Sequence, residues 1–416
     1  MNKQIIITAI IGMLVGVVFT VAGVGIRLYF SKMDKEQPVV TQQDKKAPSV
    51  RENIPPVQLS NFEHFDVGKS RNVKSMLADG SVLWVGTSGG LVKYDTISQK
   101  HEEFNSKTSP LLSNGIFFLD KFDNKLWVGT YGGGLSVYDG KEWKNYNIPY
   151  GLADPFVYGI LKATNGDIWI ATWSGANQII GGHIDDTSAW RTYTVENTNG
   201  GLPNDWVYGM DVDSKGVIWL GTEGGLARYD GKTWQNWNHE KGLGAPYEKV
   251  KDSIIKSQDS SSDQSKHHAK QRVEMGLENI EVPFNPNYIV SMLVDAKDRI
   301  WVGTWGGGLS MFENGKFTTY TTEEGLLGNY LSMLKEEADG TIWAGSDRGL
   351  SKLVEGPNGK ISFANYTTLD GLYSKYTFSM VFTKDKSAWV GSFGGLTHFI
   401  GGMPQPMHQL AKPLIR

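Results

Sequence analysis

Short apolar stretches separated by polar and glycine-rich turns recur along most of the chain, from about residue 57 to residue 402. One unit shows the pattern clearly, and it predicts four strands at residues 288–294, 300–304, 309–312 and 316–321. Asn314-Gly315 separates the last two strands, and this pair suits the positive φ angles of a tight hairpin. Four short strands joined by tight turns predict one antiparallel sheet.

The second strand of this unit carries a Trp-x-Gly-Thr motif that is repeated, with small changes, along the chain. The motif begins at Trp84, Trp127, Trp169, Trp219, Trp301, Trp343 and Trp389. Most intervals are about 40–50 residues, which is close to the length of a four-stranded propeller blade. The sequence therefore predicts an all-β fold, a seven-bladed β-propeller over residues 57–403, with a tail at 404–416. Because the tryptophans recur in every unit, we interpret them as structural.

The two ends of the repeat region complement each other. The last unit has three strands and then reaches Gly401-Gly402, so its outer strand is missing. Residues 61–65 resemble an outer strand without a sheet. We expect this N-terminal strand to complete the seventh blade, which would remove a free sheet edge.

The interval between Trp219 and Trp301 is about twice the usual blade length. Residues 245–285 within it lack the motif, and residues 256–265 are polar and low in complexity. We interpret 245–285 as a polar surface insertion and not as an eighth blade.

The N-terminal segment has no charged residue between Lys3 and Arg27 and is rich in Ile and Val. This exceeds the roughly 20 apolar residues that cross a bilayer as a helix, so residues 1–30 are predicted to be one transmembrane signal-anchor. Small residues such as Ala22 and Gly23 leave cleavage open as an alternative. Residues 31–56 are polar and proline-containing, which predicts a flexible stalk.

Charge does not fix the orientation of this anchor. Lys3 lies on one side, whereas Arg27, Lys32 and Lys35 lie on the other, which by the positive-inside rule favours a cytoplasmic propeller. Large domains, however, can translocate largely regardless of such charges.

Composition excludes several classes of function. The chain has no cysteine, so it has no disulfide, thiolate metal site or cysteine nucleophile. Its net charge of −3 does not indicate a basic surface that would bind nucleic acid. The eight histidines show no metal-ligand spacing, and we expect no cofactor, no metal and no catalytic constellation. A propeller lyase or hydrolase is a minor alternative, with His183 or His239 acting together with Glu223.

One position varies between blades while its neighbours are constant, namely the residue that follows Gly-Thr. We call these seven residues the slot residues; they are Ser88, Tyr131, Trp173, Glu223, Trp305, Asp347 and Phe393. The returns between blades should bring further aromatics to the same end of the ring, including Phe156, Tyr158, Trp206, Tyr208, Tyr288, Tyr330 and Tyr376.

Aromatic rings with a few carboxylates suit a ligand that offers both a flat face and polar groups. We therefore predict a binding site for a glycan or a peptide, formed by Tyr131, Trp173, Glu223, Trp305, Asp347, Phe393, Trp206 and Tyr330. The alternative is that these rings pack between neighbouring blades.

The repeat reads Gly-Leu-x-x-Asn/Asp-aromatic, a strand, and then Asp-x-x-Gly-x-Ile-Trp-Val-Gly-Thr-x-Gly-Gly-Leu. It resembles the two-component regulator propeller repeat over about residues 57–402. The resemblance implies an extracytoplasmic sensor module of the kind found in membrane histidine kinases, some of which respond to oligosaccharides.

No kinase segment follows the last blade, so we expect the signal to be transmitted by a separate partner such as a sensor kinase or an envelope component. On this interpretation the protein is a single-pass protein of the bacterial inner membrane, with its propeller on the extracytoplasmic (periplasmic) side. The alternative is a structural interaction platform in an envelope assembly.

Overall fold

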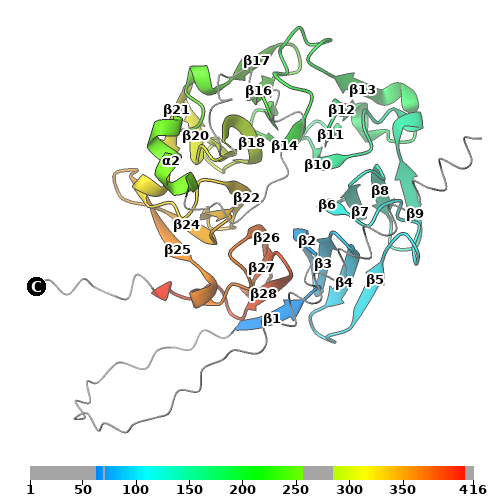
Figure 1. Cartoon of the computed structure of the whole chain (residues 1–416). Coiled ribbons are helices and arrows are strands. Elements are labelled where there is room, and N and C mark those ends of the chain that lie inside the picture. The colour runs from blue at the N-terminus through cyan, green and yellow to red at the C-terminus, as the bar shows by residue number, and fades with distance from the viewer. Residues whose placement is uncertain (1–61, 69–70, 256–283, 408–416) are drawn as a thin grey trace, which may run out of the picture. The chain divides into compact units, whose positions relative to one another are not determined.

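The computed structural model describes residues 62–68, 71–255 and 284–407. These residues form seven four-stranded antiparallel sheets around a central axis, with the first strand of each blade nearest the axis (Figure 1). The predicted all-β, seven-bladed propeller is therefore confirmed. Apart from 3-10 turns, the described residues contain one short helix.

The first three blades follow one another without long insertions. Blade 1 contains β2 (Val73–Asp79), β3 (Val82–Thr87), β4 (Gly90–Asp95) and β5 (His101–Phe104). Blade 2 contains β6 (Ile116–Phe122), β7 (Lys125–Thr130), β8 (Leu135–Tyr138) and β9 (Trp143–Tyr146). Blade 3 contains β10 (Val157–Lys162), β11 (Ile168–Thr172), β12 (Gly175–Ile179) and β13 (Trp190–Tyr193).

The next three blades have the same order, from the axis outwards. Blade 4 contains β14 (Val207–Val212), β15 (Ile218–Thr222), β16 (Gly225–Tyr229) and β17 (Trp234–Trp237). Blade 5 contains β18 (Asn285–Val294), β19 (Ile300–Trp305), β20 (Leu309–Glu313) and β21 (Lys316–Tyr320). Blade 6 contains β22 (Leu331–Glu336), β23 (Ile342–Ser346), β24 (Leu350–Glu355) and β25 (Ile361–Tyr366).

Blade 7 is built from both ends of the described chain. It contains β26 (Thr377–Phe382), β27 (Ala388–Ser392), β28 (Gly395–Phe399) and, as its outer strand, β1 (Phe62–Asp66). β1 pairs antiparallel with β28, from Phe62 opposite Phe399 to Asp66 opposite Gly395. The N-terminal strand thus closes the ring, as the sequence predicted.

The repeated motif forms the core between blades. All seven motif tryptophans are buried, with exposed fractions of 5% or less, and Trp301 has none. The motif glycine allows neighbouring blades to approach each other: a Cβ on Gly303 would lie 2.4 Å from Cβ of Leu331 in blade 6. The structural interpretation of the tryptophans is confirmed.

The returns between blades are also repeated. Short 3-10 turns, such as η5 (Thr322–Glu324), end at a glycine with positive φ and are followed by a buried leucine. Gly325 has φ 97°, and Leu326 is 3% exposed within a cluster that includes Trp301. Thr321 and Glu324 form a reciprocal capping box at this turn. These hydrogen bonds fix the conformation of the turn that connects one blade to the next.

The described ends of segment 245–285 are not simply polar. Residues Tyr247–Ile255 form helix α2, and Val250 and Ile254 are buried in a cluster with Ala245 and Phe284. The predicted polar surface insertion thus begins with a helix that has one apolar, packed face. Residues 256–283 lie outside the described residues, and the described part of the segment contributes no sheet of its own.

The predicted anchor at 1–30 and the predicted stalk at 31–56 also lie outside the described residues, as does most of the predicted tail. Within the described part of the chain, no helix has the length and apolar content needed to span a bilayer.

Candidate functional site

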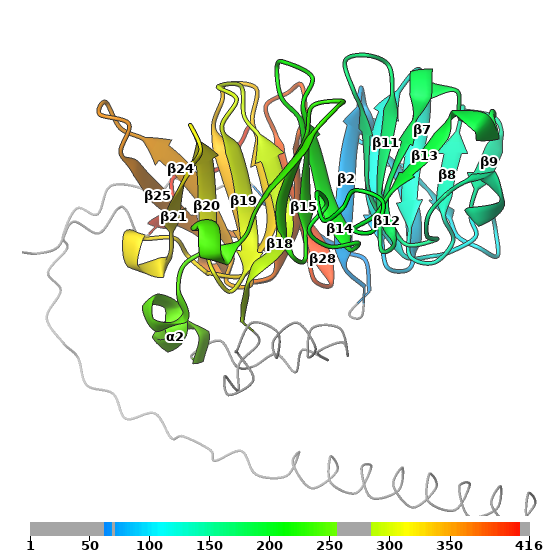
Figure 2. The same cartoon turned by 90° about the horizontal axis from the view of Figure 1, so that it is seen from above.

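All seven slot residues lie at one end of the propeller, which we call the loop face, because each ends or directly follows the second strand of its blade. In blades 1 to 6 a Thr or Ser hydroxyl donates a hydrogen bond across the turn to a glycine carbonyl, as from Thr87 to Gly90 at 2.8 Å and from Thr304 to Gly308 at 3.0 Å. Helix α2 lies at this face (Figure 2), where its Ile254 approaches Gly306. The loop face therefore combines fixed turns with side chains that differ from blade to blade.

Aromatic rings on blades 2, 3 and 4 form a continuous stack along the loop face. Tyr131 meets Phe156 edge-on at 4.6 Å between ring centroids. Phe156 stacks on Trp173 at 4.4 Å, and Trp173 stacks on Trp206 at 4.8 Å. Both faces of the Trp173 indole are thus covered by rings of the protein, so Trp173 has no free face for a ligand. For this residue, the packing alternative describes the structure.

The slot residues of blades 4 to 6 are also largely covered. The Glu223 side chain has no exposed surface, which corrects the expectation that it offers a carboxylate to a ligand. Trp305 is half-buried and lies 5.7 Å from Tyr288 and 5.3 Å from Tyr330. Tyr330 packs in turn against the apolar cluster of helix α2. Asp347 is half-buried beside Gly328.

By contrast, the slot residues of blades 7, 1 and 2 are exposed, and we call Phe393, Ser88 and Tyr131 the open arc. Phe393 is 43% exposed and Tyr131 is 48% exposed, which is unusual for large aromatic side chains. Ser88 between them is small and also exposed. Of the eight residues predicted to bind a ligand, Tyr131 and Phe393 are therefore the ones that present substantial surface.

Next to the slot residues, the first strand of every blade has an irregular register at the same position. The register skips one residue in each blade, namely Lys74, Phe117, Tyr158, Tyr208, Val290, Ser332 and Phe378, which we call the inner ring. A bulge of this kind re-aims a side chain, and bulges are frequent beside functional sites. The sequence did not predict this inner ring, because alternation within a strand gives no sign of where one extra residue is inserted.

The inner ring joins adjacent blades around the axis. Phe117 lies 4.8 Å from Tyr158, and Tyr158 lies 4.9 Å from Tyr208. Burial raises the pKa of both tyrosines, so their hydroxyls remain protonated at neutral pH and can donate hydrogen bonds.

Lys74 is the inner-ring residue of blade 1, in the middle of the open arc. Its ammonium group lies 4.1 Å from the centroid of the Phe378 ring in blade 7, a cation–π contact. Burial lowers the pKa of Lys74 to about 8, and the side chain forms no salt bridge with any described residue. It is therefore a donor, mostly charged at neutral pH, in the blade that lies between those of Phe393 and Tyr131.

Of the residues considered for a lyase, His183 lies away from Glu223 and the other slot residues. His183 follows β12 at the end where Ile179 pairs with Ile168, opposite the end that carries the slot residues. The Nδ1 atom of His239 lies 2.7 Å from the Leu243 carbonyl oxygen. Among the described residues no group of three His, Asp or Glu side chains is arranged to hold a metal ion.

Comparison with known proteins agrees with the repeat. Residues 201–224 and 283–306 match the two-component regulator propeller family. A histidine kinase, P4 of Formosa agariphila, is 32% identical over 184 residues, which are 40% of this chain and 13% of that protein. The chain therefore spans a small part of this relative's length.

Solved structures share the fold at low sequence identity. The extracellular domain of the hybrid two component system BT3049 of B. thetaiotaomicron has a TM-score of 0.60 at 22% identity, covering 83% of this chain and 40% of that one. Virginiamycin B lyase of Staphylococcus aureus has a TM-score of 0.56 at 13% identity, covering 81% of this chain and 98% of that one. At these identities the likeness concerns the fold.

Proposed function

We propose that this chain, which carries two-component regulator propeller repeats, is an extracytoplasmic sensory module that binds a glycan at the open arc of its loop face. On this proposal residues 1–30 anchor it in the inner membrane, and the signal passes to a separate partner such as a sensor kinase. The likeness to a histidine kinase and to the extracellular domain of a hybrid two component system supports this assignment.

The observation that carries the proposal is the uneven exposure of the slot residues. Trp173 and Glu223 are covered by neighbouring side chains, whereas Phe393 and Tyr131 are 43% and 48% exposed on either side of Ser88. Large exposed aromatics on rigid turns usually serve recognition, because they supply contact area at little cost in conformational entropy.

A glycan fits this arrangement better than an apolar ligand. A pyranose ring offers an apolar face to Tyr131 or Phe393 and hydroxyl groups to polar neighbours. Ser88 and the ammonium group of Lys74 supply such polar groups in blade 1. A separation of aromatic contacts by one blade is suited to an oligosaccharide rather than a single sugar.

The test is a glycan array probed with the purified full chain, alongside a peptide array. The proposal expects retention of a defined set of oligosaccharides, and weaker retention of the same set by Tyr131→Ala and Phe393→Ala. Ile97→Ala is a matched control, since Ile97 is 82% exposed in the β4–β5 hairpin at the opposite end of blade 1. Retention by peptides instead, or equal loss with Ile97→Ala, would contradict the glycan assignment.

A further inference from the structure

The outer strands of the seven blades share one register, and blade 1 departs from it at a single position. In each blade the start of the outer strand faces the third strand in the pairs Tyr94–His101, Tyr138–Trp143, Ile179–Trp190, Tyr229–Trp234, Phe312–Phe317, Leu353–Phe363 and Phe399–Phe62. Six of these outer-strand residues are Trp or Phe. In blade 1 the residue is His101, and it is exposed.

We call the boundary between two neighbouring blades a seam. At other seams the Trp or Phe ring at this outer-strand position fills the space between two neighbouring outer strands. Trp143 of blade 2 stacks on Tyr138 of its own blade at 4.7 Å and contacts Phe104 of blade 1 at 5.7 Å. Trp234 of blade 4 does the same, at 4.6 Å from Tyr229 and 5.4 Å from Tyr193 of blade 3. The ring is thus held between an aromatic of its own blade and one of the preceding blade.

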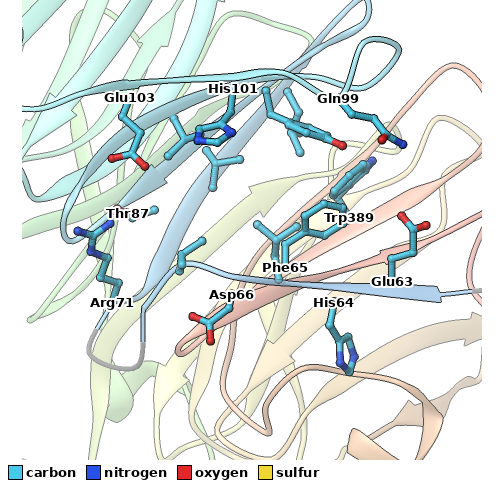
Figure 3. A pocket seen from close by; sticks show the side chains of 16 residues that line it. Glu63, His64, Phe65, Asp66, Arg71, Thr87, Gln99, His101, Glu103 and Trp389 are labelled. Atoms are coloured by element: carbon cyan, nitrogen blue, oxygen red, sulfur yellow. The ribbon is translucent and has the colours of Figure 1, made fainter.

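The seam between blades 7 and 1 has both of these aromatic partners without the ring that would fill it. Tyr94 of blade 1 and Phe65 of blade 7 are 5.7 Å apart, and Phe65 lies 5.3 Å from Trp389. These residues line an open cavity of about 710 Å³, with His101 at its edge (Figure 3). The cavity therefore lies where a Trp or Phe side chain packs at other seams.

The rim of this cavity is predominantly acidic. Glu63 and Glu103 contribute two carboxylates on the side of β1 that carries Phe65, against one guanidinium from Arg71, whereas Asp66 projects from the opposite side of β1 (Figure 3). Opposite charges attract most strongly where the site is partly desolvated, so the rim favours a cation next to the ring that enters.

The chain itself does not offer a matching ring outside its predicted anchor. Residues 31–61, 256–283 and 408–416 contain no Phe, Trp or Tyr. Phe19, Tyr29 and Phe30 all lie within the segment predicted to be the membrane anchor. This favours an occupant from another molecule.

We propose that the seam between blades 7 and 1 is a docking pocket for a Trp or Phe side chain of a partner polypeptide, with a Lys or Arg of the same segment paired to the rim carboxylates. The ring packs against both Tyr94 and Phe65, as Trp143 packs against both Tyr138 and Phe104. Because it joins β1 to blade 1, the docked segment also reinforces the closure of the ring. This pocket runs between blades 7 and 1, and its lining extends to Arg71 and to Thr87, the residue that precedes Ser88 of the open arc.

The experiment uses the full chain and the peptide acetyl-Lys-Trp-Lys-amide, with acetyl-Lys-Ala-Lys-amide as its control, titrated by calorimetry. We expect binding of the Trp peptide and at least about tenfold weaker binding of the Ala peptide, as for a buried aromatic anchor. Glu103→Gln should weaken binding of the Trp peptide severalfold and reduce its salt dependence. Binding of free tryptamine without binding of the peptide would overturn the assignment to a polypeptide.

The matched variant is His101→Trp, which places in blade 1 the ring that other blades already have. We expect this variant to raise Tm by about 2–4 °C and to lose binding of the Trp peptide, because its own indole occupies the cavity. Ile148→Trp adds an indole at an exposed position of another return and should change neither property. If His101→Trp bound the peptide like the parent, the pocket would not be the docking site.

Discussion

The indole rings of Trp173 and Trp206 lie parallel, with centroids 4.8 Å apart and an interplanar angle of 4°. Trp173 belongs to the slot turn of blade 3, and Trp206 belongs to the segment that enters blade 4. Their contact joins the two blades at the loop face. A slot residue can therefore serve the scaffold, as Trp173 does, and need not be free to contact a ligand.

Trp173→Ala is expected to destabilise the propeller, because it removes the central ring of the stack between Phe156 and Trp206. The loss in the free energy of unfolding should be about 2 kcal/mol, less than for a fully buried tryptophan. Urea denaturation measures it. An unchanged denaturation midpoint would show that the stack contributes little and would return Trp173 to the list of ligand-binding candidates.

Trp301→Ala should have a larger effect. Trp301 is fully buried, and its indole N–H donates a hydrogen bond to Oδ2 of Asp295 at 2.8 Å. Truncation should cost about 3–5 kcal/mol of the free energy of unfolding. Trp301→Phe keeps most of the apolar contact and removes the donor, so it should cost about 1–3 kcal/mol. Equal effects of the two variants would contradict this separation of the apolar contact of Trp301 from its hydrogen bond.

Deletion of residues 1–68 removes β1 and should expose the edge of β28, to which β1 is paired from Phe62 to Asp66. We expect a lower Tm and concentration-dependent aggregation, because an unpaired strand edge is a template for association. Deletion of residues 1–56 is the control and should leave the Tm of the propeller unchanged. If both truncated proteins had the same Tm, β1 would not be the closing strand in solution.

Lys74 should make stability depend on pH. Its pKa is lowered from 10.5 to about 8 in the folded protein, so the unfolded chain binds more protons between these values. The destabilising effect of Lys74 is full below about pH 8 and disappears as the pH rises through this window. Lys74→Met should therefore increase the free energy of unfolding at pH 7 by on the order of 2 kcal/mol.

The comparison of parent and Lys74→Met by urea denaturation at pH 7 and at about pH 11 checks this expectation. Tyrosine ionisation affects both proteins at high pH and cancels in the difference. A difference between the two proteins that stayed constant across the range would mean that Lys74 is not desolvated.

The blades could be predicted from the sequence because the tryptophan motif is periodic and each copy meets the same environment. Closure by β1 could also be predicted, because residues 61–65 resemble an outer strand and blade 7 lacks one. Both inferences depend on patterns within one blade.

The accessibility of the slot could not be predicted in this way, because it depends on the neighbouring blade. Phe393 meets Asn72 and Tyr131 meets Phe156 edge-on, and both rings are exposed, whereas Trp173 stacks on both Phe156 and Trp206 and is covered. The inner ring depends on bulges that the alternation of a strand does not encode. Helix α2 was missed because its charged residues mask the apolar positions Val250 and Ile254.

The central claim is that the open arc binds a glycan, and calorimetric titration of the best oligosaccharide from the array tests it most directly. Phe393→Ala should weaken the affinity by about 1–3 kcal/mol, which is roughly five- to 150-fold, while its Tm stays close to that of the parent. Ile97→Ala should bind like the parent. Binding by Phe393→Ala and Tyr131→Ala with the affinity of the parent would contradict the account.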